Sequence, residues 1–275
     1  MHKSYETEQS NRKLRRHNLV PQIMTVGDYE LSLLPPQKYD VNYIPSFPII
    51  GFAFDSQEGM HGFASDKIMP FRARANGVAF LPKGCEVTSK SQRGGEYLNI
   101  KILGEKFSDQ LPQNQFTDLI EPRAIPTAEC LRRMVISRDV FDPLEYEEQI
   151  VKLCSFLSSS QECVKEKSIG RWMTKRRLKC VDEFIEAKMS GTLKVKDLAG
   201  MLNLSEGFFN RSFKAAMGKT PHSYILDRRM AKARNLIITT DQKLSDIAAI
   251  CGFASQSHMT SKMKRSIGIT PGELR

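Results

Sequence analysis

The sequence predicts an α+β chain, with a β-rich N-terminal domain that carries trailing helices and an all-α C-terminal domain. Short segments rich in β-branched and aromatic residues, separated by turn residues, fill the N-terminal half. A helix-turn-helix pattern occurs twice near the C-terminus, and basic residues are concentrated around it. A chain of 275 residues has room for two such domains, since one domain commonly takes about 100 to 200 residues.

Composition sets the expected domain boundaries. Residues 1–20 are polar and include a basic stretch, so we expect a flexible tail, with a nucleic-acid contact as the alternative. No apolar segment of a secretory signal follows, and no run approaches the roughly 18 apolar residues of a membrane span. We therefore expect a cytoplasmic protein without a membrane partner. The β-rich domain should occupy residues 21–157, a small polar linker residues 158–170, and the all-α domain residues 171–275.

The N-terminal half contains strand patterns followed by helix patterns. The strand-forming segments include DYELSLLP, IIGFAF, GVAFLPKGCEV and EYLNIKIL, with Gly, Pro, Asn and Asp between them, as in an all-β barrel or jelly roll. Helical patterns follow at Thr127–Val140 and Pro143–Leu157. In the second pattern, Ile150, Cys154 and Leu157 form an apolar stripe, which burial against the β domain and a dimer seam explain equally well.

The sequence does not favour an enzyme. The N-terminal half contains only three histidines, His2, His17 and His61, whereas a metal-dependent barrel enzyme needs several with a carboxylate. His61 alone is better explained as a turn or surface residue. The chain has no nucleophile elbow, P-loop or dinucleotide fingerprint. We expect no catalytic residues, no metal, no cofactor, and reduced thiols at the six scattered cysteines, Cys85, Cys130, Cys154, Cys163, Cys180 and Cys251.

Positive charge is concentrated in the C-terminal third. Residues 171–275 contain 20 Lys and Arg against 9 Asp and Glu, whereas the other 170 residues contain 21 against 22. The formal net charge of +10 therefore belongs almost entirely to one domain. A basic domain beside a neutral one indicates a polyanion partner for the basic domain alone.

An internal repeat lies within this basic region. The segment SEGFFNRSFKAAMGKTP (Ser205–Pro221) matches SQSHMTSKMKRSIGITP (Ser255–Pro271) at an offset of 50 residues. Upstream, Asp197–Ala199 matches Asp246–Ala248 at an offset of 49, so the second copy should have one extra residue in its turn. Such a repeat predicts two copies of one supersecondary element.

Each copy has the pattern of a helix, a tight turn and a second helix. Apolar residues recur at helical spacing in Leu198–Leu202 and in Ile247–Cys251. The second helices should begin after a capping Ser and end at a left-handed Gly, at Ser205 and Gly218 in the first copy and at Ser255 and Gly268 in the second. The sequence therefore predicts two helix-turn-helix units.

The second helix of each copy should present hydrogen-bonding side chains opposite its apolar face. With Phe209 and Met259 placed in the core, a rotation of about 100° per residue assigns the outward positions. They are Gly207, Asn210, Arg211 and Lys214 in the first copy and Ser257, Thr260, Ser261 and Lys264 in the second, where Gln256 lies in the first turn. A solvated surface is the alternative explanation for one such helix, but two of them in a basic region favour nucleic acid.

The outward residue types match the chemistry of the DNA major groove. Arg can read guanine, and Asn or Gln can read adenine, so Arg211, Asn210 and Gln256 are the expected base readers. The cations Lys214, Lys264 and Arg265 should hold phosphates. The helical segment PHSYILDRRMAKARNLI between the copies should act as a strut. If it holds them about 34 Å apart, residues 205–217 and 255–266 can enter two successive major grooves.

Three segments of the C-terminal third carry a specific pattern of residues and spacings: DLAGMLNLSEGFFNRSFKAAMGKTPHSYI, RRMAKARNLI and LSDIAAICGFASQSHMTSKMKRSIGITPGELR. They resemble the DNA-binding domain of AraC/XylS-type bacterial transcription regulators. The resemblance implies DNA contacts on Gly207, Asn210, Arg211, Gln256, Ser257 and Ser261. Gly207 and Ser261 are smaller than the residues that often read bases at these positions in the family, and Met259 and Met263 replace its usual large apolar residues.

The resemblance also has implications for the N-terminal half. In that family, a cupin-like β domain with trailing helices commonly binds an effector and mediates dimerisation. It implies a sequence-specific transcription regulator with double-stranded promoter DNA and RNA polymerase as partners, and it allows a homodimer. The N-terminal domain would bind an unknown small effector or a protein partner, and a cupin-type enzyme fused to a DNA-binding module is the least favoured alternative.

Overall fold

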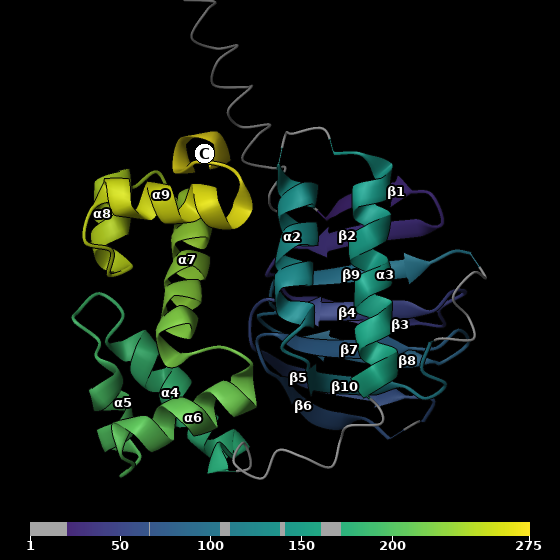
Figure 1. The fold of residues 1–275 in the computed structure, drawn as a ribbon, viewed down its shortest axis with the longest axis horizontal. Helices are drawn as coiled ribbons and strands as arrows, with labels where there is room; N and C mark the ends of the chain where they lie inside the picture. Colours follow the sequence, from purple (N-terminus) through teal and green to yellow (C-terminus); the bar gives the residue numbers. More distant parts are fainter. Residues whose placement is uncertain (1–20, 66, 105–110, 138–140, 161–171) are drawn as a thin grey trace, which may run out of the picture. The chain divides into compact units, whose positions relative to one another are not determined.

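The computed structural model describes residues 21–65, 67–104, 111–137, 141–160 and 172–275 (Figure 1). The chain divides into two units, Met1–Val164 and Lys165–Arg275, which we name the β unit and the helical unit. The predicted fold class is confirmed, because strands and two trailing helices form the β unit and helices alone form the described part of the helical unit. The expected tail at residues 1–20 lies outside the described residues.

Two antiparallel sheets form the β unit. The first has the strand order β1-β2-β9-β4-β7-β10 and the second has the order β3-β8-β5-β6. The strands among the described residues are β1 (Gln22–Val26), β2 (Tyr29–Leu34), β3 (Tyr39–Tyr43), β4 (Ile49–Ala53), β5 (Gln57–Phe63), β6 (Met69–Ala73), β7 (Gly77–Leu81), β8 (Val87–Ser91), β9 (Tyr97–Ile102) and β10 (Phe116–Ile120). Alternation sets their faces: in β9, Leu98, Ile100 and Ile102 are buried while the residues between them face the other side.

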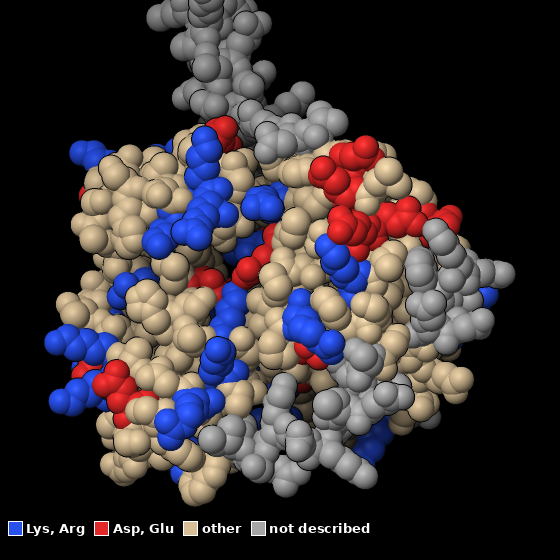
Figure 2. Space-filling model, viewed as in Figure 1, with Lys and Arg blue, Asp and Glu red and all other residues tan. Residues whose placement is uncertain are grey.

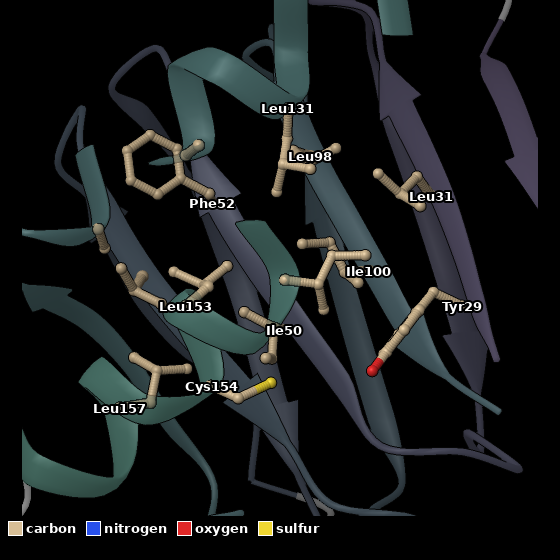
Figure 3. Close-up of a cluster of buried hydrophobic side chains, with 14 of the residues drawn as sticks. Tyr29, Leu31, Ile50, Phe52, Leu98, Ile100, Leu131, Leu153, Cys154 and Leu157 are labelled. Carbon is tan, nitrogen blue, oxygen red and sulfur yellow. The ribbon is translucent and has the colours of Figure 1, made fainter. Parts of the chain in front are cut away.

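The main core lies between the six-stranded sheet and the helices α2 (Ala124–Ile136) and α3 (Pro143–Ser160). Figure 3 shows Leu153, Cys154 and Leu157 of α3 turned toward sheet residues that include Ile50. The predicted stripe of Ile150, Cys154 and Leu157 is at most 1% exposed. Burial against the β domain therefore explains this stripe, and a dimer seam through it is excluded because the sheet already covers it.

The helix boundaries differ slightly from the predicted ones. Helix α2 begins at Ala124, three residues before the predicted start. Helix α3 continues to Ser160, so residues 158–160 of the expected linker are helical, and residues 161–170 lie outside the described part of the chain. His61 is also corrected: it lies within β5, with its ring stacked on Phe71 at a centroid distance of 4.7 Å, and not in a turn.

The other face of the six-stranded sheet has small residues at Gly51 and Ala79, beside the ring of Tyr97. Gly51 stands opposite Ala79 in β7 and Asn99 in β9. A Cβ atom at Gly51 would overlap the hydroxyl of Tyr97, so this position needs glycine for the close approach of the ring. Burial raises the pKa of Tyr97, and the neighbouring Tyr43 and Tyr39 raise it further. Since both neighbours belong to β3, the two sheets approach each other here.

The inward face of the four-stranded sheet is only partly covered. Strand pairing places Val41 opposite Ser89, and Ser89 opposite His61. Val87, on the same face, is 3% exposed, but Val41, Tyr43 and Met69 keep 40%, 38% and 46% of their surface exposed. Apolar side chains therefore remain accessible on the side of this sheet that faces the other one.

Seven helices make up the described part of the helical unit: α4 (Lys175–Ala187), α5 (Val195–Met201), α6 (Glu206–Met217), α7 (Pro221–Thr239), α8 (Leu244–Ile250), α9 (Gln256–Ile267) and α10 (Pro271–Leu274). Helices α5 and α6 form the first helix-turn-helix, and α8 and α9 form the second. Helix α7 connects them and packs against α6, α8 and α9. Within the described ranges, no helix combines the length and the apolar character that crossing a membrane requires.

Candidate nucleic-acid interface

The two helix-turn-helix turns share the same backbone geometry. The N–H of Leu204 donates to the carbonyl of Ala199 at 2.9 Å, and the N–H of Phe253 donates to the carbonyl of Ala248 at 2.9 Å. The residue before each donor is left-handed, Asn203 with φ 54° and Gly252 with φ 75°. Leu204 and Phe253 are therefore equivalent, at an offset of 49 residues. The capping residues Ser205 and Ser255 are offset by 50, so the extra residue that the sequence predicts in the second turn follows Phe253.

The predicted helix ends are also confirmed. The hydroxyl of Ser205 accepts from the N–H of Phe208 at 3.3 Å, and that of Ser255 accepts from the N–H of His258 at 3.1 Å. Helices α6 and α9 both run for 12 residues and end at a left-handed glycine, Gly218 with φ 71° and Gly268 with φ 81°. Caps at both ends therefore fix which residues are helical and which way they face.

The buried face of each second helix sets its orientation. Phe209 and Phe213 of α6, like Met259 and Met263 of α9, are at most 1% exposed. Ser212 is also fully buried, and its hydroxyl donates to the carbonyl of Phe208 at 2.9 Å, which satisfies it without a partner outside the helix. Apolar packing thus directs the opposite face of each helix outward.

The ten residues predicted to contact DNA lie on these outward faces. Asn210 and Thr260 are half-buried, and the other eight are exposed, namely Gly207, Arg211, Lys214, Gln256, Ser257, Ser261, Lys264 and Arg265. The four residues of the first copy lie together on α6, and the six residues of the second copy lie together on α9. A Cβ atom at Gly207 would lie 3.6 Å from Nη1 of Arg211. Arg211 therefore lies beside Gly207, which can offer only its backbone to a ligand.

Helix α7 is the rigid connection that the sequence predicts. Its 19 residues span about 28 Å at 1.5 Å per residue. The hydroxyl of Tyr224 donates to Oδ1 of Asp182 in α4 at 2.6 Å, and its ring packs edge-on against Phe213 of α6 at 5.3 Å. Met230, Ala233 and Ile237 are buried further along the helix.

A direct contact joins the second helix-turn-helix unit to the segment between α4 and α5. A Cβ atom at Gly252, in the second turn, would overlap the carbonyl oxygen of Met189 beyond α4 and would lie 2.8 Å from Nη2 of Arg229. Nη2 of Arg229 also donates to the carbonyl of Gly191 at 3.1 Å. Burial lowers the pKa of Arg229 from its ordinary value. We name Met189, Arg229 and Gly252 the junction; it fixes the second turn against the segment between α4 and α5.

Some residues beside the predicted site were not anticipated. His258 of α9 is exposed, and its ring lies edge-on to Phe253 with centroids 5.7 Å apart. The offset of 50 makes it the counterpart of Phe208, so the repeat itself contained the signal that could have found it. Figure 2 shows Lys and Arg side chains spread over the helical unit, as the charge distribution predicts.

This geometry is that of a duplicated helix-turn-helix, a motif whose second helix commonly binds the DNA major groove. Residues 198–275 match the family model described as a helix-turn-helix domain. The probable transcriptional regulator LumQ of Photobacterium leiognathi is 30% identical over 123 residues, which are 43% of this chain and 50% of LumQ. The HTH-type transcriptional regulator ExsA of Pseudomonas aeruginosa is 29% identical over 108 residues, which are 39% of each chain.

A solved structure of a transcriptional regulator from Chromobacterium violaceum, an AraC-type DNA-binding domain-containing protein, is 31% identical. The match covers 37% of this chain and 90% of that one, with a TM-score of 0.35. The chain spans half or less of the length of the two curated relatives above. The C-terminal domain of this chain is therefore similar to the helix-turn-helix domains of bacterial transcription regulators.

Proposed function

We propose that this protein is a cytoplasmic bacterial transcription regulator that binds promoter DNA sequence-specifically. It reads two successive major grooves with residues 205–217 and 255–266. The observation that carries this proposal is the pair of outward polar faces on α6 and α9, each opposite a fully buried apolar face. A single face of this kind fits a solvated surface, but two related by a repeat and joined by one strut fit a duplex with repeating grooves.

The roles of the individual residues follow from their chemistry. Arg211 and Asn210 of α6 and Gln256 of α9 read bases, since their groups can form paired hydrogen bonds with base edges. Lys214, Lys264 and Arg265 lie toward the ends of the two helices and hold phosphates. Ser257, Thr260 and Ser261 supply shorter hydroxyl contacts, and Gly207 allows the backbone of α6 to approach the DNA.

Selection of random genomic fragments by the full-length protein at two salt concentrations tests this proposal. We expect one enriched motif with two half-sites about 10 base pairs apart. Binding to unrelated fragments should fall steeply with salt, because it depends on counterion release from phosphates. Enrichment of no sequence, together with loss of all binding at high salt, would mean that the helical unit is only a nonspecific polyanion binder.

The β unit controls this activity through a bound effector or a protein partner. The accessible inward side chains of the four-stranded sheet, Val41, Tyr43 and Met69, favour a small molecule that combines apolar surface with hydrogen-bonding groups. Tyr39 and Tyr97 bring further hydroxyls to the same side. A protein partner is the alternative, because exposed apolar side chains also serve protein contacts.

Thermal unfolding in the presence of small uncharged aromatic and hydroxylated compounds separates these two modes of control. A bound effector raises the melting temperature of the β unit in proportion to its concentration. Replacement of Tyr97 by Phe, which keeps the ring over Gly51, should weaken that response if the hydroxyl binds the effector. A protein partner predicts no shift with any compound and a protein that co-purifies with the chain.

A homodimer and a contact with RNA polymerase complete the proposal, in keeping with a regulator that acts at promoters. Analytical ultracentrifugation with and without DNA tests the dimer. The enzyme alternative is weaker because the curated relatives are named as transcription regulators. In the described parts of the chain, no three His, Cys, Asp or Glu residues cluster in a way that could hold a metal ion. Metal analysis of the purified protein tests that alternative directly.

A further inference from the structure

A group of basic and aromatic side chains lies at the start of α4, outside the ten predicted residues. We name Trp172, Lys175, Arg176 and Arg177 the α4 patch. Lys175 and Arg176 are exposed, and neither side chain forms an ion pair with any residue that the structure describes. Trp172 is also 52% exposed, although it is a large aromatic residue. The patch therefore presents cations and an aromatic ring to a partner outside the helical unit.

The α4 patch adjoins the outward face of α6. The ring of Trp172 packs edge-on against Phe208, with centroids 5.5 Å apart and an interplanar angle of 88°. Phe208 precedes Arg211 by three residues, and residues at this spacing are neighbours on a helix surface. Glu206, the acidic residue in the first turn of α6, lies about 160° around the helix from Phe208. The patch thus extends the basic surface on the side of Arg211.

Arg177 holds the aromatic part of the patch in place. Its Nη1 donates to the carbonyl of Trp172 at 2.8 Å, and its Cζ lies 5.6 Å from the centre of the Trp172 ring. These two interactions fix the indole against Phe208. Arg177 therefore acts as a positioning residue, and Lys175 and Arg176 are the cations available for a ligand.

The charge at the start of α4 is opposite to what a helix favours. Its first turn contains Lys175, Arg176 and Arg177 and no acidic residue, whereas α5 and α8 have Asp197 and Asp246 in theirs. The partial positive charge of a helix start repels cations, so these side chains cost stability in the free protein. A polyanion beside them would remove that repulsion. The neighbouring α6 face identifies the nearest polyanion as the DNA that it reads.

We propose that the α4 patch binds backbone phosphates beside the groove that α6 enters. Lys175 and Arg176 each contact a phosphate through their side chains, and Trp172 packs along the sugar-phosphate backbone. The proposal rests on the proposed DNA-binding function of α6. The α4 patch would add affinity for every sequence and set the register of α6 in its groove, since phosphate contacts position a protein without reading bases.

The salt dependence of binding tests this proposal with full-length protein. Each phosphate contact adds about 0.9 to the slope of log affinity against log salt. We expect K175Q/R176Q to lower that slope by about 1.8 with the sequence preference unchanged. The control K83Q/K90Q removes the same charge from exposed positions of the β unit and should leave the slope unchanged. The melting temperature of K175Q/R176Q should not fall, because the lost cations oppose the helix dipole.

Trp172 supplies a second readout, because it is the only tryptophan in the sequence. If DNA covers the patch, a saturating duplex should protect its fluorescence from quenching by neutral acrylamide. A slope that falls in K175Q/R176Q alone, together with this protection, supports the proposal. An equal slope in the two variants, or unprotected fluorescence in a saturated complex, overturns it. Protection by an acidic protein but not by DNA also overturns it in favour of a protein-binding surface.

The two proposals fail in different ways. If the wild-type protein enriches no sequence, the proposed regulator function fails. The slopes of the variants on nonspecific DNA still decide whether the patch contacts phosphates. If the wild-type protein selects a motif and K175Q/R176Q keeps the wild-type slope, only the α4 patch proposal is wrong.

Discussion

At the scale of single residues, Arg211 and Lys214 occupy the same face of α6 but should act differently. Both are exposed, and they are separated by less than one helical turn. The planar guanidinium of Arg211 can form two hydrogen bonds with guanine, whereas the ammonium of Lys214 is a point charge suited to a phosphate. Their replacement by alanine therefore distinguishes base reading from phosphate binding.

Arg211→Ala should weaken binding to the selected motif by about 1 to 3 kcal/mol and relax the preference at one base pair. Lys214→Ala should weaken binding to all sequences and lower the salt slope by about 1. Competition binding against a set of single-base variants of the motif measures both effects. Equal losses on every sequence for both variants would contradict these assignments. Lys90→Ala, in the β unit, is the control for a general loss of charge.

Cys251 illustrates how burial controls thiol chemistry. It is fully buried, and burial raises its pKa from 9.0 to about 11. The thiolate is the reactive form, so alkylation of Cys251 in the native protein at pH 8 should be far slower than in urea. Mass spectrometry after timed alkylation, with half-buried Cys180 as the internal control, checks this expectation. Equal alkylation rates at Cys251 in the native and unfolded protein would contradict it.

The same shift in pKa affects stability. Because the folded state holds the thiol proton more tightly than the unfolded state, the contribution of Cys251 is complete below about pH 9. It should be lost as the pH rises toward about 11, where the folded thiol also ionises. Urea unfolding at a series of pH values should therefore show a decreasing free energy of unfolding across this window.

At the scale of elements, local chemistry made the helical unit predictable. The capping serines and terminal glycines defined α6 and α9 from sequence alone, because these residue types satisfy groups within their own helix ends. The junction was not predictable, since Gly252 meets the carbonyl of Met189 only after tertiary folding. Trp172 was missed for the same reason: its partner Phe208 lies 36 positions away in the sequence.

The β unit was less predictable than the helical unit. Strands β2, β4, β7 and β9 lie within segments that the residue types indicated. Strands β5 and β6, with the sequences QEGMHGF and MPFRA, lack a clear apolar alternation. Their conformation depends on pairing, β5 with β8 and β6 with β5, so it comes from the sheet and not from local propensity. The accessible face of this sheet could not be inferred for the same reason.

Gly252→Ala should be strongly destabilising, because two effects act together at the junction. A left-handed conformation costs a non-glycine residue about 1 to 2 kcal/mol. The added Cβ would also overlap the backbone carbonyl of Met189, which cannot move without shifting the segment between α4 and α5. Gly200→Ala is the matched control, since a Cβ there meets no atom within 4 Å and alanine favours a helix. Thermal unfolding of the two variants, with the control at or above the wild-type melting temperature, checks this prediction.

At the scale of the whole molecule, the spacing of the two reading helices should restrict which operators the protein can bind. Helix α7 is continuous over 19 residues, and the junction joins the second turn directly to the segment between α4 and α5, which leads into the first unit. The helical unit should therefore hold its two reading helices at a fixed spacing, which fits two half-sites on one side of the duplex separated by about one helical repeat of 34 Å. A flexible connection would instead tolerate half-sites at several separations.

Insertions between the half-sites separate these two possibilities. Five inserted base pairs rotate one half-site to the opposite side of the duplex, and ten restore the side but move it about 34 Å further away. A rigid helical unit should lose the contacts of one helix with either insertion, at about 1 to 3 kcal/mol for each base contact. Gel-shift titrations of the full-length protein measure this loss, with five base pairs inserted outside both half-sites as the control. Tight binding to the ten-base-pair insertion alone would show that α7 or the junction is flexible. The spacing of the two reading helices would then be determined by the DNA and not by the protein.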